Sequence, residues 1–487
     1  MLAAEPALTS SFAPRPGGID PLGLRQINFD LMDRVFPGLN NVARHIRPFT
    51  VVTWAWHRAA ACAREMGQAK AQVAVLQDFV DRIEVIYAWS QFRRNGNADL
   101  PGRDVLAPVI AAGHYEFGGD DWHKKCETRR YSTALSSPIN YGPALKALGW
   151  VQQDDEGRGA LRAMPVADNA IAAFESQIAC HLGHPAFCKF GPVSVTNADV
   201  DLWAKTWLLE SPTTAEQTLM TRLLTGEAAN KLRRDGIMLA VAASQAVGSV
   251  DVLGVRRTMC GSPTAFVAPS GLQTTAQAWR AVQVRQAFRL ALEALFHWVL
   301  RELDRRPATT STLVERFLAG AGDAPNTAEW LQVPDAEQRG PADRVDHLEK
   351  SLAPLGAEPE LLCGIRKTLA MSIAEAPAKA GAERYDRLPL ARAAKEARER
   401  SGCPPAEFMA HVIESWVFGQ HAYWSIGRGL ADARGHGKTI LRLKATREEN
   451  GWRVAPGANV SDRSAPAATG DRLETALTLA REAGLIT

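Results

Sequence analysis

The chain of 487 residues has little of what marks a secreted or membrane protein. It contains no apolar run approaching the ~20 residues that a membrane-spanning helix needs. The stretch Met1–Gly18 has neither the charged start nor the apolar core of a signal peptide. The seven cysteines are odd in number and widely dispersed, which argues against a disulfide framework. We therefore expect a cytoplasmic protein with no membrane partner.

Motifs for the hydrolysis of nucleotides or nucleic acids are also missing. The stretch Asp432–Thr439 (DARGHGKT) resembles a phosphate-binding loop, but it starts with Asp instead of Gly, and a helix precedes it where a strand is needed. Two His-x-Lys triplets, at His123 and His436, lack the aspartate that phospholipase-D-type nucleases place downstream. No lysine has Asp or Glu two positions before it, as restriction-type nucleases require. We therefore expect no catalytic residues and no enzymatic activity from the chain itself.

What the chain does contain is material for large helical cores. With 46% hydrophobic residues, 22% charged residues and a mean hydropathy of −0.16, it has the composition of a soluble globular protein. Its net charge of +3 is too small to indicate a nucleic-acid-binding protein by itself. Apolar residues recur at helical spacing along much of the chain. The clearest predicted helices are Pro21–Phe36, Asn40–Met66, Ala71–Phe92, Thr274–Leu303 and Asp471–Ala483.

Two β-hairpins are predicted among these helices. Trp150–Met164 consists of two extended pieces around an acidic, glycine-rich turn. The short helix Pro143–Leu148 precedes this hairpin and the helix Val166–Ile178 follows it, so that 131–178 has the pattern of a winged helix. A second hairpin is predicted at 439–454, where an Asn-Gly pair turns the chain.

The fold class that we predict is mainly α: a multi-domain helical protein with small, winged-helix-like β-hairpin elements. Changes in composition set the expected boundaries, above all the Ala-, Gly-, Pro- and Thr-rich stretch that follows Arg306–Pro307. The expected parts are a flexible N-terminal arm (1–19), an N-terminal helical domain with the winged-helix-like segment (20–190), a central helical domain (191–307), a linker (308–341) and a C-terminal helical domain with the second hairpin (342–487).

One group of residues has the chemistry of a metal site. Cys180, His184 and Cys188 recur at intervals of four, which would place sulfur and imidazole ligands suited to zinc on one face of a continuous helix. Gly183 and Pro185 would interrupt such a helix, and free cysteines are also common in protein cores. The alternatives are therefore a structural zinc site and ordinary core residues, and no other cofactor is expected.

The candidate contacts to nucleic acid lie in the N-terminal helices, where four arginines occur close together. They are Arg34, Arg44, Arg47 and Arg58. Arginines that share a helical face bind phosphate groups through counterion release and without sequence preference. The alternative is a solvated face on which these arginines form ion pairs with Asp30, Asp33 or Glu65.

A helix near the C-terminus raises a further catalytic possibility. Helical ribonuclease domains cleave RNA with an Arg followed a few residues later by a His, but here His421 comes before Arg428. Trp416, Tyr423 and Trp424 share this helix, and an aromatic stripe at helical spacing is typical of a core. We interpret the helix as structural.

Four segments resemble a group of uncharacterised bacterial proteins that are often found in antiphage defence islands. The first, Gly23–Arg47, has a glycine-led start, a Phe-Pro-Gly break and a following Arg-hydrophobic-Arg. The others are Tyr141–Trp150, Trp279–Leu300 and Asp471–Ile486. The chain departs from the family at Pro48–Thr50, where an aromatic residue is usual. The resemblance brings no catalytic residue with it and implies a biological context.

The function that we predict is that of a non-catalytic subunit of a bacterial antiphage defence system, which binds nucleic acid or scaffolds partner enzymes. Such partners would be defence proteins such as an ATPase, a helicase or a nuclease. Two alternatives stay open: a divergent metal-dependent nuclease or helical ribonuclease, and a DNA-binding transcriptional regulator.

Overall fold

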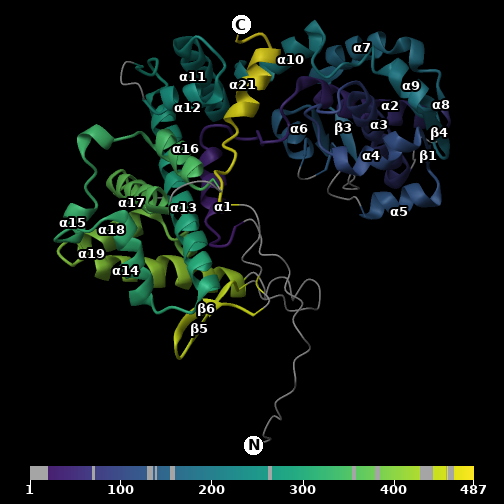
Figure 1. Cartoon of the computed structure of the whole chain (residues 1–487). Helices are drawn as coiled ribbons and strands as arrows, with labels where there is room; N and C mark the ends of the chain where they lie inside the picture. Colours follow the sequence, from purple (N-terminus) through teal and green to yellow (C-terminus); the bar gives the residue numbers. More distant parts are fainter. Residues whose placement is uncertain are drawn as a thin grey trace, which may run out of the picture. The chain divides into compact units, whose positions relative to one another are not determined.

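A computed structural model shows a mainly helical protein, as the sequence predicts (Figure 1). It describes residues 20–67, 72–128, 135–137, 140–153, 160–261, 266–353, 358–378, 384–427, 443–456, 458 and 465–486. The described residues form two compact units, and each unit combines stretches that are far apart in the chain.

The two units differ from the domains expected from composition. Unit 1 takes the described residues of Met1–Leu31, Cys260–Ala265 and Gln277–Thr469, and unit 2 takes those of Met32–Met259, Phe266–Ala276 and Gly470–Thr487. An early segment thus packs with helices of the second half of the chain, and the last helix packs with those of the first half. Composition could not indicate this exchange, because contacts between distant segments leave no trace in local residue content. The expected arm, 1–19, lies outside the described residues.

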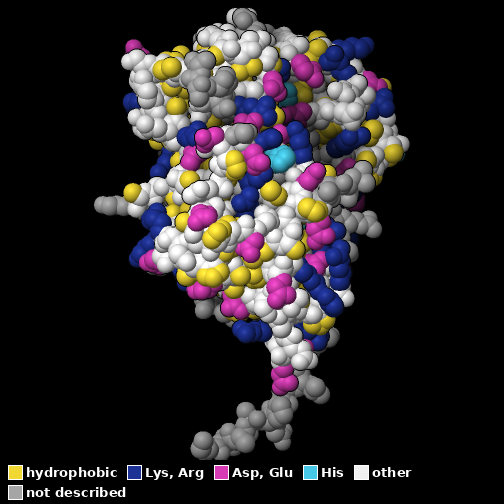
Figure 2. All heavy atoms as spheres, turned by 60° about the vertical axis from the view of Figure 1, so that its left-hand side comes forward, with side chains coloured by type: hydrophobic (Ala, Val, Ile, Leu, Met, Phe, Trp, Pro, Cys, Tyr) yellow, Lys and Arg dark blue, Asp and Glu magenta, His cyan; other side chains and the backbone are white. Residues whose placement is uncertain are grey.

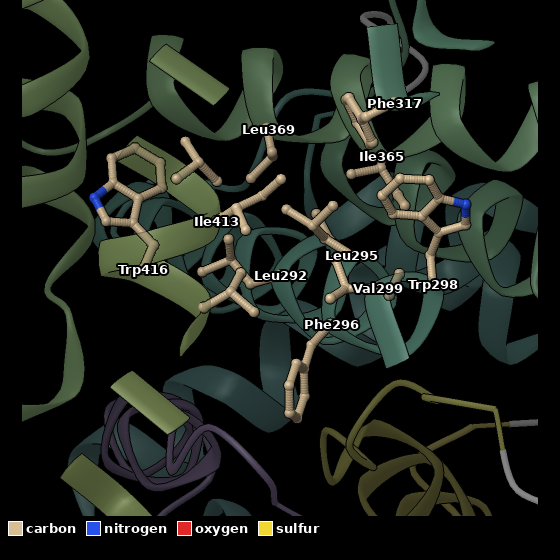
Figure 3. Close-up of a cluster of buried hydrophobic side chains, with 14 of the residues drawn as sticks. Leu292, Leu295, Phe296, Trp298, Val299, Phe317, Ile365, Leu369, Ile413 and Trp416 are labelled. Carbon is tan, nitrogen blue, oxygen red and sulfur yellow. The ribbon is translucent and has the colours of Figure 1, made fainter. Parts of the chain in front are cut away.

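Unit 1 is organised around one long helix, α13 (Gln273–Arg305). Figure 3 shows its apolar side chains packed against those of three later elements, α14, α17 and η5. The labelled side chains of this core are Leu292, Leu295, Phe296, Trp298, Val299, Phe317, Ile365, Leu369, Ile413 and Trp416. The other elements of unit 1 are α1 (Arg25–Met32), α14 (Thr310–Ala321), α15 (Thr327–Trp330), η3 (Asp335–Glu337), α16 (Pro341–Ser351), α17 (Glu358–Ala374), η4 (Tyr385–Arg387), α18 (Leu390–Glu399), α19 (Pro405–His411), the π-helical η5 (Val412–Gly419), β5 (Ala445–Glu448) and β6 (Gly451–Val454).

The stretch 308–341, which was expected to be a linker, contributes to the core of unit 1. Helix α14 buries Leu313 and Phe317, and Trp330 at the end of α15 is fully buried. The polar residues that suggested a linker are helix caps: the side chains of Thr309 and Asn326 accept hydrogen bonds from the first turns of α14 and α15. Caps and linkers draw on the same residue types, so composition alone could not separate them.

Unit 2 is built around helix α2 (Ile46–Glu65), which is buried along most of its length because it packs against α3, α7 and α10. The last helix, α21, packs against α10, α11 and α12 (Figure 1). The elements that follow α2 are α3 (Val73–Arg94), α4 (Arg103–Ala112), β1 (His114–Phe117), α5 (Asp120–Thr128), α6 (Gly142–Leu148), β2 (Val151–Gln153), β3 (Leu161–Ala163), η1 (Pro165–Ala167), α7 (Asp168–Gln177), η2 (Ala179–His181), α8 (Pro185–Cys188), β4 (Val193–Thr196), α9 (Asn197–Trp203), α10 (Thr214–Thr225), α11 (Lys231–Val247), α12 (Val252–Met259) and α21 (Leu473–Glu482).

The strands pair two by two, in antiparallel register. Strands β2 and β3 pair where the first hairpin was predicted, and β5 and β6 pair where the second was predicted. The pairing of β1 with β4, which sets His114 opposite Thr196, was not predicted. These two strands are short and lie far apart in the sequence, so no turn signal connects them.

The first two predicted helices begin later than expected, α1 at Arg25 and α2 at Ile46. The carboxylate of Asp20 accepts a hydrogen bond from the amide of Leu24 at 2.9 Å, and α1 follows. The side chain of Asn40 caps a turn at Val42 and Ala43, and not the long helix α2 itself.

Among the described residues, no single helix combines the length and hydropathy of a membrane span. Helices α11 and α12 meet that criterion only when they are taken together, and the chain bends by 112° between them.

Candidate nucleic-acid interface and metal centre

Arg47 lies in the first turn of α2 with its side chain fully buried. Its guanidinium forms an ion pair with Glu216 at 3.3 Å, donates to the side chain of Gln177 at 2.9 Å and donates to the carbonyl of Ser211. It also lies over the ring of Phe174, 5.2 Å from the ring centre. The prediction that Arg47 binds nucleic acid therefore needs correction. The side chain is enclosed because α2 packs on α7 and α10 at this point, and a phosphate cannot reach it.

Arg44 and Arg58 are partly exposed, but both are bound within unit 2. Nη1 of Arg44 lies 3.2 Å from Glu474 and 3.3 Å from Asp99. Nε of Arg58 donates to a carbonyl of α8 at 3.1 Å, and its Nη1 pairs with Glu65 at 3.2 Å. Glu65 is one of the partners named by the ion-pair alternative. Each arginine would have to leave its partners before it could bind a phosphate.

Arg34 follows α1 and is exposed, unlike the other three arginines. Asp33 beside it, also named by the ion-pair alternative, pairs with Arg472. The four arginines do not form one continuous basic surface, since Arg47 is internal. Nucleic-acid binding by Arg34, Arg44 and Arg58 stays a prediction, and the geometry favours the ion-pair alternative for all but Arg34.

The residues of the candidate zinc site do not share one helix. Cys180 lies in η2, and a turn separates it from His184, which caps the short helix α8. Nδ1 of His184 accepts a hydrogen bond from the amide of Ala186 at 3.1 Å. Sγ of Cys188 donates to the carbonyl of His184 at 3.4 Å. Within the described residues, no group of three His, Cys, Asp or Glu side chains has the arrangement of a metal site.

His421, which was considered for a ribonuclease role, uses both of its ring nitrogens in unit 1. Nδ1 donates to the carbonyl of Pro21 at 2.8 Å, and Nε2 accepts a hydrogen bond from the amide of Lys444 at 2.9 Å. Burial lowers the pKa of His421 to about 4, so that the ring is neutral at pH 7. A neutral histidine with both nitrogens bound to the main chain has no lone pair left to act as a base. Arg428 lies outside the described residues.

Helix α3 contains a row of carboxylic acids that we did not predict as a site from the sequence. Asp78, Asp81 and Glu84 recur at intervals of three. Glu84 is fully buried and accepts a hydrogen bond from the amide of Ser136 at 3.2 Å. Burial and the neighbouring carboxylates raise the pKa of both Asp81 and Glu84. Perturbed acids are common at active sites, but Glu84 is closed to solvent. Acids at this spacing inside an apolar helix were the signal that could have revealed the row.

The remaining motif residues lie on the surface or outside the described residues. His123 is exposed on α5, with Nδ1 3.8 Å from Asp78. The stretch Asp432–Thr439, which includes His436, lies outside the described residues.

Comparison of the chain with protein-family models, with curated proteins and with solved structures found no match in any of the three. The fold itself therefore defines the class: a mainly helical protein of two compact units.

Proposed function

We propose that the protein is a non-catalytic subunit of a bacterial antiphage defence system, in which it scaffolds partner proteins. The resemblance of its four segments to proteins of defence islands supports this context. The observation that carries the proposal is the structural use of side chains that could otherwise do chemistry or bind phosphate. Arg47 is neutralised by Glu216 inside unit 2, and His421 has both ring nitrogens bound to the main chain inside unit 1.

The distribution of charge favours scaffolding over nucleic-acid binding. Proteins that bind phosphate backbones gather Lys and Arg into a stripe on one face. On the face shown in Figure 2, Lys and Arg side chains are interspersed with Asp and Glu side chains. The net charge of +3 agrees with such a mixture. In this proposal a partner ATPase, helicase or nuclease supplies the chemistry, and each of the two units acts as a separate domain.

The winged-helix-like segment, α6 to α7, has the role of a packing or protein-binding module in this proposal. In helix-turn-helix proteins a helix enters the major groove of DNA and presents several polar side chains to base edges. Helix α6, which precedes the hairpin, has a single basic residue, Lys146. Its C-terminal end is covered by Arg233, which donates to the carbonyl of Ala147 at 3.4 Å. A short, nearly neutral helix with a covered end is better suited to packing than to reading DNA.

Reconstitution with the products of the neighbouring genes tests the scaffold. We expect the full chain to form a complex of defined stoichiometry, measured by size-exclusion chromatography with light scattering. ATPase or nuclease activity should belong to a partner, and the purified chain alone should show neither. Cleavage by the purified chain that a single substitution abolishes would contradict the proposal and favour the nuclease alternative.

Binding to random duplex DNA across a salt series tests the nucleic-acid alternatives. We expect no binding at physiological salt. Binding whose log–log salt slope falls by about 0.9 in Arg34→Ala would show a phosphate contact and contradict the preference for scaffolding. Arg64→Ala, which removes another exposed arginine of unit 2, is the matched control. Preference for a promoter sequence over random DNA would favour a transcriptional regulator.

A further inference from the structure

Unit 1 contains an open cavity of about 1180 Å³ that has no part in the proposed scaffold. The loop 331–340, the start of α16, the end of α17 and Arg280 of α13 line it. Pockets of roughly 300–1,000 Å³ hold small organic ligands, so this cavity has room for one and for solvent beside it. Its lining shows which chemistry the ligand must have.

Three arginines line the cavity, and one of them, Arg344, is buried. Arg344 is 2% exposed, and its Nη2 donates to the carbonyl of Glu337 at 2.6 Å. Its Nε is buried without a hydrogen-bond partner among the described residues. The carboxylate of Glu337 pairs with Lys367 instead. Burial, and next the nearby charge of Arg339, lower the pKa of Arg344. A buried guanidinium without a carboxylate partner is costly unless an anion compensates it.

The carboxylates that line the cavity already have partners in the protein. The pairs are Glu375 with Arg280 at 2.7 Å through both oxygens, Asp335 with Gln338 at 2.7 Å, and Glu329 with Asn326 at 2.7 Å. The acidic and basic residues of the lining are equal in number, but their situations differ. Glu375 is paired with a cation, Asp335 and Glu329 accept hydrogen bonds from neutral amides, and Arg339 is exposed. Arg339 and Arg344 are the groups of the lining that an anion would contact.

Two further features of the cavity lining indicate the chemistry of the ligand. The N-cap of α16 is Gly340, which lines the cavity and has no side chain to accept hydrogen bonds from the first turn of the helix. An uncapped helix N-terminus favours a phosphate group, here beside the buried Arg344. The lining also contains apolar side chains, those of Leu331 and Val333 from the loop and of Met371 from α17.

We propose that this cavity binds a small organic phosphate with an apolar body, of the chemical class of a nucleoside monophosphate. The phosphate contacts Arg344, Arg339 and the N-terminus of α16, and the base lies against Leu331 and Met371. Ligand binding here does not depend on scaffolding, so either can fail without the other.

Calorimetric titration of the purified full chain tests the site. The probes are AMP, GMP, CMP and UMP, with adenosine and inorganic phosphate as the two halves of a ligand. We expect at least one monophosphate to bind about tenfold more tightly than either half, because each half makes only part of the contacts. Absence of binding by all four monophosphates at millimolar concentration overturns the proposal. Adenosine that binds as well as AMP overturns the phosphate contact, and phosphate that binds as well as AMP overturns the apolar contact.

Substitutions locate the site on the chain. Arg339→Ala removes an exposed side chain and should weaken binding about tenfold, and Arg344→Met should weaken it further. Arg301→Ala is the matched control, because Arg301 is an exposed arginine of unit 1 outside the cavity lining. Thermal unfolding verifies that each variant is folded. If Arg344→Met is not folded, the affinity of Arg339→Ala alone tests the assignment of the site. Equal affinity in Arg339→Ala and Arg301→Ala overturns the assignment.

Discussion

The two units each bind one end of the described chain, but by different chemistry. In unit 1, residues 20–23 are bound through their main chain, since four consecutive carbonyls accept hydrogen bonds from side chains. The pairs are Asp20 with Trp424 Nε1 at 3.0 Å, Pro21 with His421 Nδ1 at 2.8 Å, Leu22 with Gln420 Nε2 at 3.1 Å and Gly23 with Arg387 Nη1 at 2.7 Å. Leu22 and Leu24 are fully buried, so apolar contacts accompany these bonds.

In unit 2, the last helix, α21, is bound through charged side chains. Glu482 accepts hydrogen bonds from Nδ1 of His45 at 2.6 Å and from the amide of Ile46 at 2.8 Å, and so caps α2. Further ion pairs join Asp471 to Arg256 at 2.6 Å, Glu474 to Arg44 at 3.2 Å and Arg472 to Asp33. Apolar residues of α21 such as Leu477 and Leu479 are buried as well.

Because the two attachments depend on different chemistry, their stabilities should change with pH in opposite directions. His421 accepts a hydrogen bond from a backbone amide through Nε2, so it must be neutral for unit 1 to hold residues 20–23. His45 lies between the carboxylates of Asp99 and Glu482, so unit 2 is most stable when this ring is protonated. Acid should therefore loosen the first attachment and alkali the second. Salt should weaken mainly the second, because exposed ion pairs are screened and buried hydrogen bonds to main-chain carbonyls are screened much less.

The largest effect is expected from Gly23→Ala in unit 1. Gly23 has φ +69°, and an added Cβ would lie 2.7 Å from Cγ of Trp424. Backbone strain and overpacking together should lower the free energy of unfolding by about 4 kcal/mol, measured by urea denaturation. Gly248→Ala is the control, because Gly248 has φ +70° and ψ +18° at the end of α11 but has no atom within 4 Å of its added Cβ. We expect that control to cost about 1 kcal/mol. Equal effects of the two substitutions would mean that Trp424 moves aside without cost.

The acid response of unit 1 should come next in size. The pKa of His421 falls from 6.5 to about 4 in the folded chain, first because of burial. A base whose folded pKa is depressed stabilises the fold fully above pH 6.5, and this stabilisation is lost as the pH falls toward 4. The loss should reach about 3 kcal/mol. Protection of residues 20–32 against hydrogen exchange, corrected for the intrinsic pH dependence of exchange, should fall over this range in the parent chain and stay level in His421→Asn. The same acid profile in both proteins would exclude His421 as the titrating group.

The alkaline response of unit 2 should be smaller. Burial lowers the pKa of His45, but hydrogen bonds to Asp99 and Glu482 outweigh it and raise the pKa to about 9. The stabilisation is therefore complete below pH 6.5 and is lost as the pH rises through 9. We expect a loss of about 2 kcal/mol, since the half-exposed Asp99 is screened by solvent. Hydrogen exchange of α21, corrected for its intrinsic pH dependence, should show this loss in the parent and not in Glu482→Gln. A parent whose α21 stays equally protected across this range would show that His45 does not control the attachment.

The sequence could predict those parts of the fold that local pattern determines. Helices α3 and α13 have apolar residues at helical spacing over many turns, so their positions agree with prediction within a few residues. The segment from α6 to α7 was also predictable, because Gly149 ends α6 with φ +82° and an extended pair follows.

Partners that meet only in space could not be predicted. The spacing of the arginines in α2 is the same whether that helix faces solvent or packs on α10, so the burial of Arg47 beside Glu216 left no local signal. The same holds for the attachment of residues 20–23 to His421, because the donors lie near the other end of the chain. Helix α2 is buried along most of its length, and for that reason Arg47 is enclosed and does not lie on the basic face that we predicted.

The smallest expected effect is that of Arg44→Ala, which separates the exposed part of the α21 attachment from its buried part. Arg44 pairs with Glu474 and Asp99, and both carboxylates are 53% exposed. Exposed ion pairs contribute little, so the free energy of unfolding should fall by about 0.5 kcal/mol at low salt. The difference from the parent should vanish near ~1 M salt, where screening is nearly complete. Urea denaturation at both salt concentrations measures this. A loss of about 2 kcal/mol, as large as the contribution expected from His45, or one that persists at high salt, would place the centre of the attachment at Arg44 and not at the cap that Glu482 forms on α2.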